Sequence, residues 1–408
     1  MLKRVRGIYR EFPPKFWTVV GVMFIDRLGG NVLWPFFTLY ITAKFEVGMT
    51  RAGLVLGILS AFSLLGSMVG GGLTDRFGRK RMILIGLVFS AISTLTLGLV
   101  EEFSTLIPLA AVIGFLSHIS GPAHSAMVAD LLPEEQRQEG FGILRVAANL
   151  TWVIGPIVGG IIADRSYFAL FVIDAVVSCL VAVLVFLTIP ETKPEIIGEP
   201  ETMLRTFAGY GKVARDLRYI AFLLVSMLML LVYQQMYSTL SVFLRDTHGV
   251  STRIFGILMI ASPIVVILFQ FPTTRAIRHR PPFLMMALGT FFYMIGFGMF
   301  GFVAAVWLFA VALIVITVGE MIIMPTSSAL AANFAPEDMR GRYLAVYGVA
   351  WGLPSIVGPS AAGLILDNYN PFLLWYIGAG ICAAAIGGFF LLQARLGHEE
   401  RFQMAKTG

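Results

Sequence analysis

The chain has 408 residues, of which 57% are hydrophobic and only 13% are charged, and its mean hydropathy is +0.83. Soluble proteins carry about 25% charged residues, so this composition excludes a soluble multidomain enzyme. The net charge of +6 is modest, and no nucleic-acid partner is expected. Cys179 and Cys382 both lie inside apolar runs, and they predict neither a disulfide nor a metal site.

Apolar runs bounded by charged or turn residues predict an all-α membrane protein with twelve spanning helices, each of about 20 residues or more. The first run is interrupted by Asp26 and Arg27, and we interpret it as a retained span, not a signal peptide. The expected spans are 16–42, 51–73, 82–101, 104–129, 140–163, 167–189, 219–244, 252–272, 282–303, 305–332, 342–366 and 371–394.

A polar stretch over 190–218 is the only long connection, and it contains three prolines and five basic residues. It predicts an N-terminal six-helix bundle over 1–189, a cytoplasmic linker over 190–218 and a C-terminal bundle over 219–408. With the N-terminus inside, the tails and cytoplasmic loops hold 23 of the 30 Lys and Arg residues, and the outer loops hold five. This bias predicts a multi-pass protein of the cell (inner) membrane with both termini cytoplasmic.

The two halves repeat at an offset of 203 residues, without gaps. The matched residues are mainly glycines, prolines and charges, which rarely coincide by chance. The pairs are Gly53 with Gly256, Pro122 with Pro325, Pro133-Glu134 with Pro336-Glu337, Arg137 with Arg340, Gly155-Pro156 with Gly358-Pro359, Gly160 with Gly363, and Asp164 with Asp367. A duplicated six-helix unit is how one large class of secondary transporters is built.

The loop after the second span resembles the G-x-x-x-D-R-x-G-R-K motif of the major facilitator superfamily. The matching residues are Gly71, Asp75, Arg76, Gly78, Arg79 and Lys80. The resemblance implies two pseudo-symmetric six-helix bundles, a central cavity and transport of a small molecule by alternating access. The sequence contains no zinc-ligand pair at helical spacing, nucleophile elbow or phosphate loop, so neither enzymatic activity nor a cofactor is expected. It also implies that this loop latches the halves together, and Asp130 is the expected ionic partner. Alternatively, the basic residues only anchor the topology.

Span five resembles the antiporter motif of the drug:proton branch of that family. Gly155, Pro156, Gly159 and Gly160 match, but Thr151 replaces the central glycine. The alternative is that these small residues only let helices pack closely. Span four carries Ser117 where many family members have an arginine, so Arg145 or His118 is the expected substitute in proton transfer.

Two acids lie near the middle of predicted spans, Asp26 in span one and Glu320 in span ten, and Asp174 in span six is left without an assigned role. A charge at the bilayer centre costs about 2.5–3.5 kcal/mol, so such residues face a cavity or a partner. Both are predicted proton-coupling residues, together with His118 and Arg145. The alternatives are a structural ion pair for Asp26 and a buried, hydrogen-bonded acid for Glu320. A buried carboxylate serves a proton or a sodium ion, and the sequence does not distinguish them.

Aromatic and polar residues at helical spacing predict a substrate cavity, although membrane aromatics also serve as packing residues or interfacial anchors. The candidates are Arg27, Asn31, Asn149, Gln234, Tyr237, Tyr347 and Trp351. The combined hypothesis is a monomeric transporter in the lipid bilayer that exports lipophilic or cationic compounds in exchange for protons. The alternatives are a carrier for one sugar, amino acid or lysolipid, and a non-transporting receptor or scaffold.

Overall fold

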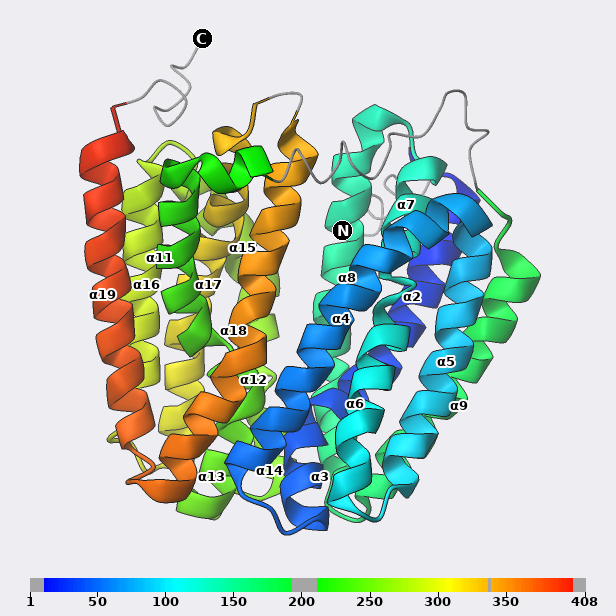
Figure 1. Ribbon diagram of the computed structural model, residues 1–408, viewed down its shortest axis with the longest axis horizontal. Coiled ribbons are helices and arrows are strands. Elements are labelled where there is room, and N and C mark those ends of the chain that lie inside the picture. The colour runs from blue at the N-terminus through cyan, green and yellow to red at the C-terminus, as the bar shows by residue number, and fades with distance from the viewer. Residues whose placement is uncertain (1–10, 193–210, 337–338, 399–408) are drawn as a thin grey trace. The chain divides into compact units, whose positions relative to one another are not determined.

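A computed structural model describes residues 11–192, 211–336 and 339–398. Within these ranges all regular elements are helices, and twelve helical segments are long and apolar enough to cross a membrane. The predicted all-α membrane architecture with twelve spans is therefore confirmed (Figure 1). Residues 193–210 of the predicted linker lie outside the described ranges.

The first six spans are formed by nine helical elements, and one helix of the eighth span packs against them. These are α2 (Pro14–Leu33), η1 (Trp34–Phe36), α3 (Phe37–Lys44), α4 (Met49–Phe77), α5 (Arg79–Leu99), α6 (Phe103–His118), α7 (Gly121–Leu131), α8 (Glu134–Ala163) and α9 (Tyr167–Thr188), with α14 (Thr252–Leu258) packed against them. The remaining elements are α11 (Leu217–Tyr233), α12 (Gln235–Ser238), α13 (Leu240–His248), α15 (Ala261–Ile277), α16 (Pro282–Met299), α17 (Val306–Phe334), α18 (Arg340–Asn368) and α19 (Leu373–Leu396).

Several spans are built from more than one helix, and proline lies at or just after three of the breaks. Pro35 lies in the 3₁₀ turn η1, Pro122 is the second residue of α7, and Pro263 lies near the start of α15. Proline lacks a backbone N–H, so it interrupts the hydrogen-bond ladder of the preceding turn. Pro156 and Pro325 are tolerated inside α8 and α17, which remain continuous.

The described residues form two compact units, and these units do not coincide with the two repeated halves of the sequence. Unit 1 comprises 11–46, 58–192 and 251–260, and unit 2 comprises 47–57, 211–250, 261–336 and 339–398. Each unit therefore contains a short piece from the other half of the sequence. In unit 1 the piece is α14, and in unit 2 it is the beginning of α4.

In unit 1 the borrowed helix α14 packs against α8 at repeated glycines. A Cβ at Gly256 would overlap the carbonyl oxygen of Pro156, and a Cβ at Gly160 would lie 3.1 Å from the carbonyl oxygen of Thr252. The Tyr167 and Thr252 hydroxyls lie 3.5 Å apart beside this contact. Small residues allow two helix backbones to approach this closely.

In unit 2 the beginning of α4 packs against α18 at the counterpart residues (Figure 1). A Cβ at Gly53 would overlap the backbone of Pro359, and a Cβ at Gly363 would overlap the backbone of Thr50. Asp367 then accepts hydrogen bonds from the amides of Met49 and Thr50, both at 2.8 Å. The carboxylate thus caps the N-terminus of α4, where free amides and the helix dipole favour a negative charge.

Aromatic pairs pack among the buried residues of each unit. In unit 1, Phe12 stacks on Phe16 with ring centroids 4.9 Å apart, inside a cluster of buried aliphatic residues. In unit 2, Phe222 stacks on Phe334 at 5.5 Å, and fully buried Tyr219 donates its hydroxyl hydrogen to the carbonyl of Tyr343 at 2.7 Å. These contacts fix the ends of the helices that carry the polar residues described below.

We predict that Asp367→Ala lowers the free energy of unfolding by about 1–2 kcal/mol, because two amides of α4 lose a charged acceptor. Thermal unfolding of the purified protein in detergent measures the change. Asp164→Ala is the matched control, because Asp164 is the repeat counterpart of Asp367 and is exposed. Equal losses in the two variants would contradict this role of Asp367.

Candidate functional sites

The turn between α4 and α5 is built around Gly78. Its φ of +95° lies in a region that residues with a side chain rarely adopt. A Cβ at this position would also lie 2.5 Å from the Oε2 atom of Glu191. Both the backbone conformation and the available space therefore require glycine, the residue that the sequence motif specifies here.

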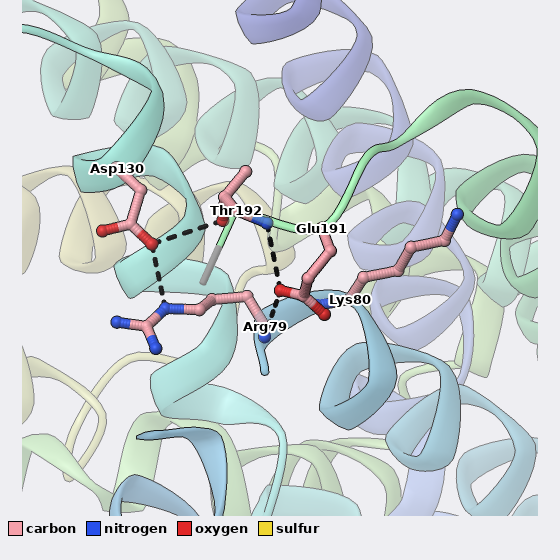
Figure 2. Close-up of polar contacts among 5 residues, drawn as sticks. All are labelled: Arg79, Lys80, Asp130, Glu191 and Thr192. Carbon is pink, nitrogen blue, oxygen red and sulfur yellow. Dashed lines mark hydrogen bonds and ion pairs between the residues drawn. The ribbon is translucent and has the colours of Figure 1, made fainter. Parts of the chain in front are cut away.

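Glu191 follows α9 and caps the N-terminus of α5 (Figure 2). Its Oε1 atom accepts hydrogen bonds from the amides of Arg79 at 2.7 Å, Thr192 at 3.0 Å and Lys80 at 3.4 Å. The carboxylate lies at the positive end of the helix dipole. The sequence analysis did not predict a role for Glu191. The signal that could have indicated one is the position of this acid, directly after an apolar span and Pro190.

Asp130 at the end of α7 joins the same group of residues (Figure 2). Its Oδ2 atom lies 2.9 Å from Arg79 Nε and accepts a 3.3 Å hydrogen bond from the Thr192 hydroxyl. The two charged side chains are only 9% and 22% exposed, so solvent screens this ion pair less than a surface pair. Lys80 Nζ donates to the Phe186 carbonyl at 2.8 Å, a second tie between α5 and α9.

Two further residues of this motif, Gly71 and Arg76, lie in α4. The Arg76 guanidinium lies over the Phe77 ring, 5.5 Å from its centroid. Gly71 lies in α4 with no atom within 4 Å of the position that a Cβ would take. The Asp75 side chain lies outside the described part of the chain.

The glycines of the second motif pack α8 against α2. A Cβ at Gly155 would lie 2.7 Å from the backbone of Asn31, and one at Gly159 would overlap the carbonyl oxygen of Val32. Thr151, which replaces the central glycine, accepts a hydrogen bond from the Asn31 amide at 2.8 Å and is fully buried. The Thr151 hydroxyl therefore gives the Asn31 amide a hydrogen-bond acceptor within the membrane-spanning bundle.

Asp26 lies in unit 1 near a second acid that sequence reasoning left unassigned. Asp174 and Arg27 are the charges that act on the Asp26 carboxylate. Asp174 is only 5% exposed and accepts a hydrogen bond from the Thr94 hydroxyl at 2.8 Å. A Cβ at Gly29, one turn after Asp26, would lie 3.0 Å from Asp174 Oδ1. Helices α2, α5 and α9 thus place two carboxylates and a hydroxyl together.

The other polar candidates of unit 1 make contacts within their own helices or are exposed. His118 ends α6 and interacts with the backbone of Gly114. Asn149 donates its amide hydrogen to the Arg145 carbonyl at 2.9 Å, so it bonds within its own helix. Arg145 is an exposed residue of α8.

Glu320 lies in unit 2 and is surrounded by tyrosines from three other helices. It is half-buried in α17 and interacts electrostatically with Tyr233, Tyr237 and Tyr293. Tyr233 and Tyr293 stack with centroids 5.3 Å apart and planes only 10° apart. The Tyr233 and Tyr237 hydroxyls lie 3.1 Å apart. Sequence reasoning selected Tyr237 but missed Tyr233 and Tyr293.

Helix α18 supplies the remaining candidates near this group. The Trp351 ring lies edge-on to Tyr233 at 6.4 Å and to Tyr347 at 6.1 Å. The Tyr347 hydroxyl donates to Ser327 Oγ at 2.6 Å, and Gln234 forms a short hydrogen bond with the Ser355 hydroxyl. The structure thus brings four of the predicted cavity residues, Gln234, Tyr237, Tyr347 and Trp351, into one aromatic region of unit 2.

Twelve spanning helices, a duplicated sequence and acids inside the spans define a membrane transport protein. The family model of the Major Facilitator Superfamily matches residues 19–359. The chain therefore belongs to this superfamily, and it is a carrier, not an enzyme.

The chain is similar to several curated relatives in sequence and to solved structures in fold. The chain is 26% identical to an uncharacterized transporter of this type, YttB of Bacillus subtilis, covering 86% of this chain and 88% of the relative. It is 25% identical to a Na⁺, Li⁺, K⁺/H⁺ antiporter of Planococcus maritimus, covering 88% and 89%. It is 22% identical to the quinolone resistance protein NorA of Staphylococcus aureus, covering 89% and 92%. A structure of the nucleoside transporter NupG matches with a TM-score of 0.81, 14% identity and coverage of 93% and 99%.

We predict that Gly78→Ala lowers the free energy of unfolding by about 1–3 kcal/mol, because alanine disfavours a φ of +95°. Glu191→Ala alone costs about 1 kcal/mol through loss of the helix cap. The double variant loses less than the sum, because removing the carboxylate removes the collision but keeps the backbone strain. Thermal unfolding in detergent gives all three values. Gly72→Ala is the control, because a Cβ there meets no atom within 4 Å.

Full additivity in the double variant would contradict the direct contact between Gly78 and Glu191. A loss in Gly72→Ala as large as in Gly78→Ala would show that any alanine in this segment is harmful, so neither the turn nor the carboxylate would explain the effect.

Proposed function

We propose that the protein exports lipophilic or cationic compounds across the cell membrane in exchange for protons. In this proposal both termini face the cytoplasm, the working form is a monomer, and the two sequence halves alternate in opening a central cavity. The observation that carries the proposal is Glu320, a half-buried acid in a membrane-spanning helix beside three tyrosines. A carboxylate in hydrocarbon is costly unless it serves a cation or a proton.

The exchange follows from competition for the acids. A cationic substrate favours the ionised carboxylate of Glu320, and a proton removes that attraction and promotes release. Asp26, close to Asp174, offers a second proton-binding carboxylate in the other unit. His118 and Arg145 are the proposed substitutes for the family arginine missing at Ser117.

The proposed gate is the contact group of Arg79, Asp130 and Glu191. It ties α5 and α7 to the segment that leads into the connection between the two sequence halves. A change in the position of that segment would therefore alter the capping of α5. Under the proposed orientation this group lies on the cytoplasmic side.

Similarity to the Planococcus antiporter favours a second candidate, exchange of an inorganic monovalent cation for protons. The carboxylates of Asp26 and Asp174 with the Thr94 hydroxyl are oxygen groups of the kind that hard cations prefer. Similarity to NorA favours the export of organic compounds. The experiment below includes both substrate classes.

The test is a flux assay in proteoliposomes with an imposed pH gradient. We predict that a lipophilic cationic dye moves against the proton flow, and that Glu320→Gln or Asp26→Asn lowers the rate by about tenfold or more, because each removes an ionisable group from a span. Asp246→Asn is the control, because Asp246 is an exposed acid that pairs with its neighbour Arg245.

Two results would overturn the proposal. Undiminished proton-driven dye flux in the double variant of Asp26 and Glu320 would remove the coupling role of both acids. Proton-coupled flux of sodium or potassium, with none for several unrelated dyes, would replace the proposal with inorganic cation exchange.

A further inference from the structure

We infer that the tyrosines around Glu320 form an aromatic binding site for organic cations, with Tyr237 as the accessible ring and Glu320 as the counter-ion. This inference rests on the proposed function and adds to it the position of the site and the groups that recognise the charge. All of these residues lie in unit 2, on α11, α12, α16 and α17.

The rings have the arrangement that an aromatic cation site needs. Tyr233 and Tyr293 are buried and stacked, so they form a fixed wall behind the site. Tyr237 lies edge-on to Tyr233 at 5.6 Å, and the residue remains 36% exposed, so a ligand can reach part of it. Trp351, also edge-on to Tyr233, is half-buried and extends the aromatic surface toward α18.

The charge of the site comes from Glu320. A cation beside this carboxylate is attracted by its negative charge and by the electron-rich faces of the neighbouring rings. Both attractions act in a region of low dielectric, where they are stronger than in water. In the sequence Glu320 is an isolated acid, because the three tyrosines lie 27 to 87 residues away from it along the chain.

The chemistry of the surroundings selects the class of ligand. Sodium and similar hard cations need several oxygen ligands, whereas the groups shown to interact with Glu320 are three tyrosine side chains. A sugar needs many hydrogen-bonding groups, and the Tyr233 and Tyr237 hydroxyls already lie within hydrogen-bond distance of each other. A weakly hydrated organic cation with aryl groups fits the rings and the carboxylate together.

The test is direct binding to the full-length protein in lipid nanodiscs, without a pH gradient. Tetraphenylphosphonium and tetraphenylborate serve as probes, because they have nearly the same size and shape but opposite charge. Isothermal titration calorimetry measures both. We expect the phosphonium to bind at least about tenfold more tightly than the borate, because the site attracts only the cation.

Three variants locate the site. Glu320→Gln should weaken phosphonium binding by about tenfold, and Tyr237→Leu should weaken it by about fivefold. Tyr237→Phe keeps the ring and should bind as the unmodified protein does. Tyr376→Leu is the matched control, because Tyr376 is a half-exposed tyrosine of unit 2 whose hydroxyl bonds the Gly301 carbonyl instead.

Each outcome decides the inference. Equal binding of both probes, or unchanged phosphonium binding in Glu320→Gln, overturns it. Equal losses of phosphonium binding in Tyr237→Phe and Tyr237→Leu also overturn it, because the ring would then not be the binding element. This pair of variants tests the inference even if Glu320→Gln does not fold. Charge-selective binding without proton-coupled transport would retain the site and reject the proposed function instead.

Discussion

Close approach of helix backbones at repeated glycines is the constraint on which the rest of this structure depends. Gly256 and Gly160 bring α14 against α8, and Gly53 and Gly363 bring the beginning of α4 against α18. At Gly256, Gly53 and Gly363 a side chain would displace a neighbouring backbone, and at Gly160 it would make a tight contact. Because the same residues recur in both halves, each half lends a short helical piece to the compact unit built mainly by the other.

Carboxylates at helix N-termini fix the ends of these helices. Asp367 binds two amides of α4, and Glu191 binds amides at the start of α5. Glu191 acts together with Gly78, since the positive φ of the glycine exposes the amides and its missing side chain leaves room for the carboxylate. The basic motif loop is thus held by an acid that comes 112 residues after Arg79 in the sequence. This contact connects the turn to the segment that follows α9.

Acids within the spans have different surroundings in the two units. Asp26 has a second carboxylate nearby, and that carboxylate is held by the Thr94 hydroxyl. Glu320 has tyrosines instead. Hydroxyl and carboxylate oxygens suit a proton or a small hard cation, whereas aromatic rings suit a large and weakly hydrated cation. The difference in neighbours gives the two acids separate proposed tasks in one transport cycle.

The sequence by itself determined the twelve spans and the motif turn, because hydrophobic length, proline and glycine act locally along the chain. The role of Thr151 could not be predicted, because its partner Asn31 lies 120 positions earlier. The same holds for Glu191 at the start of α5 and for Tyr233 and Tyr293 beside Glu320. In each case the sequence gives the residue type, but only the tertiary packing of distant helices decides its neighbours. Hydrogen bonds and charges act over a few ångströms in space, whatever the separation along the chain.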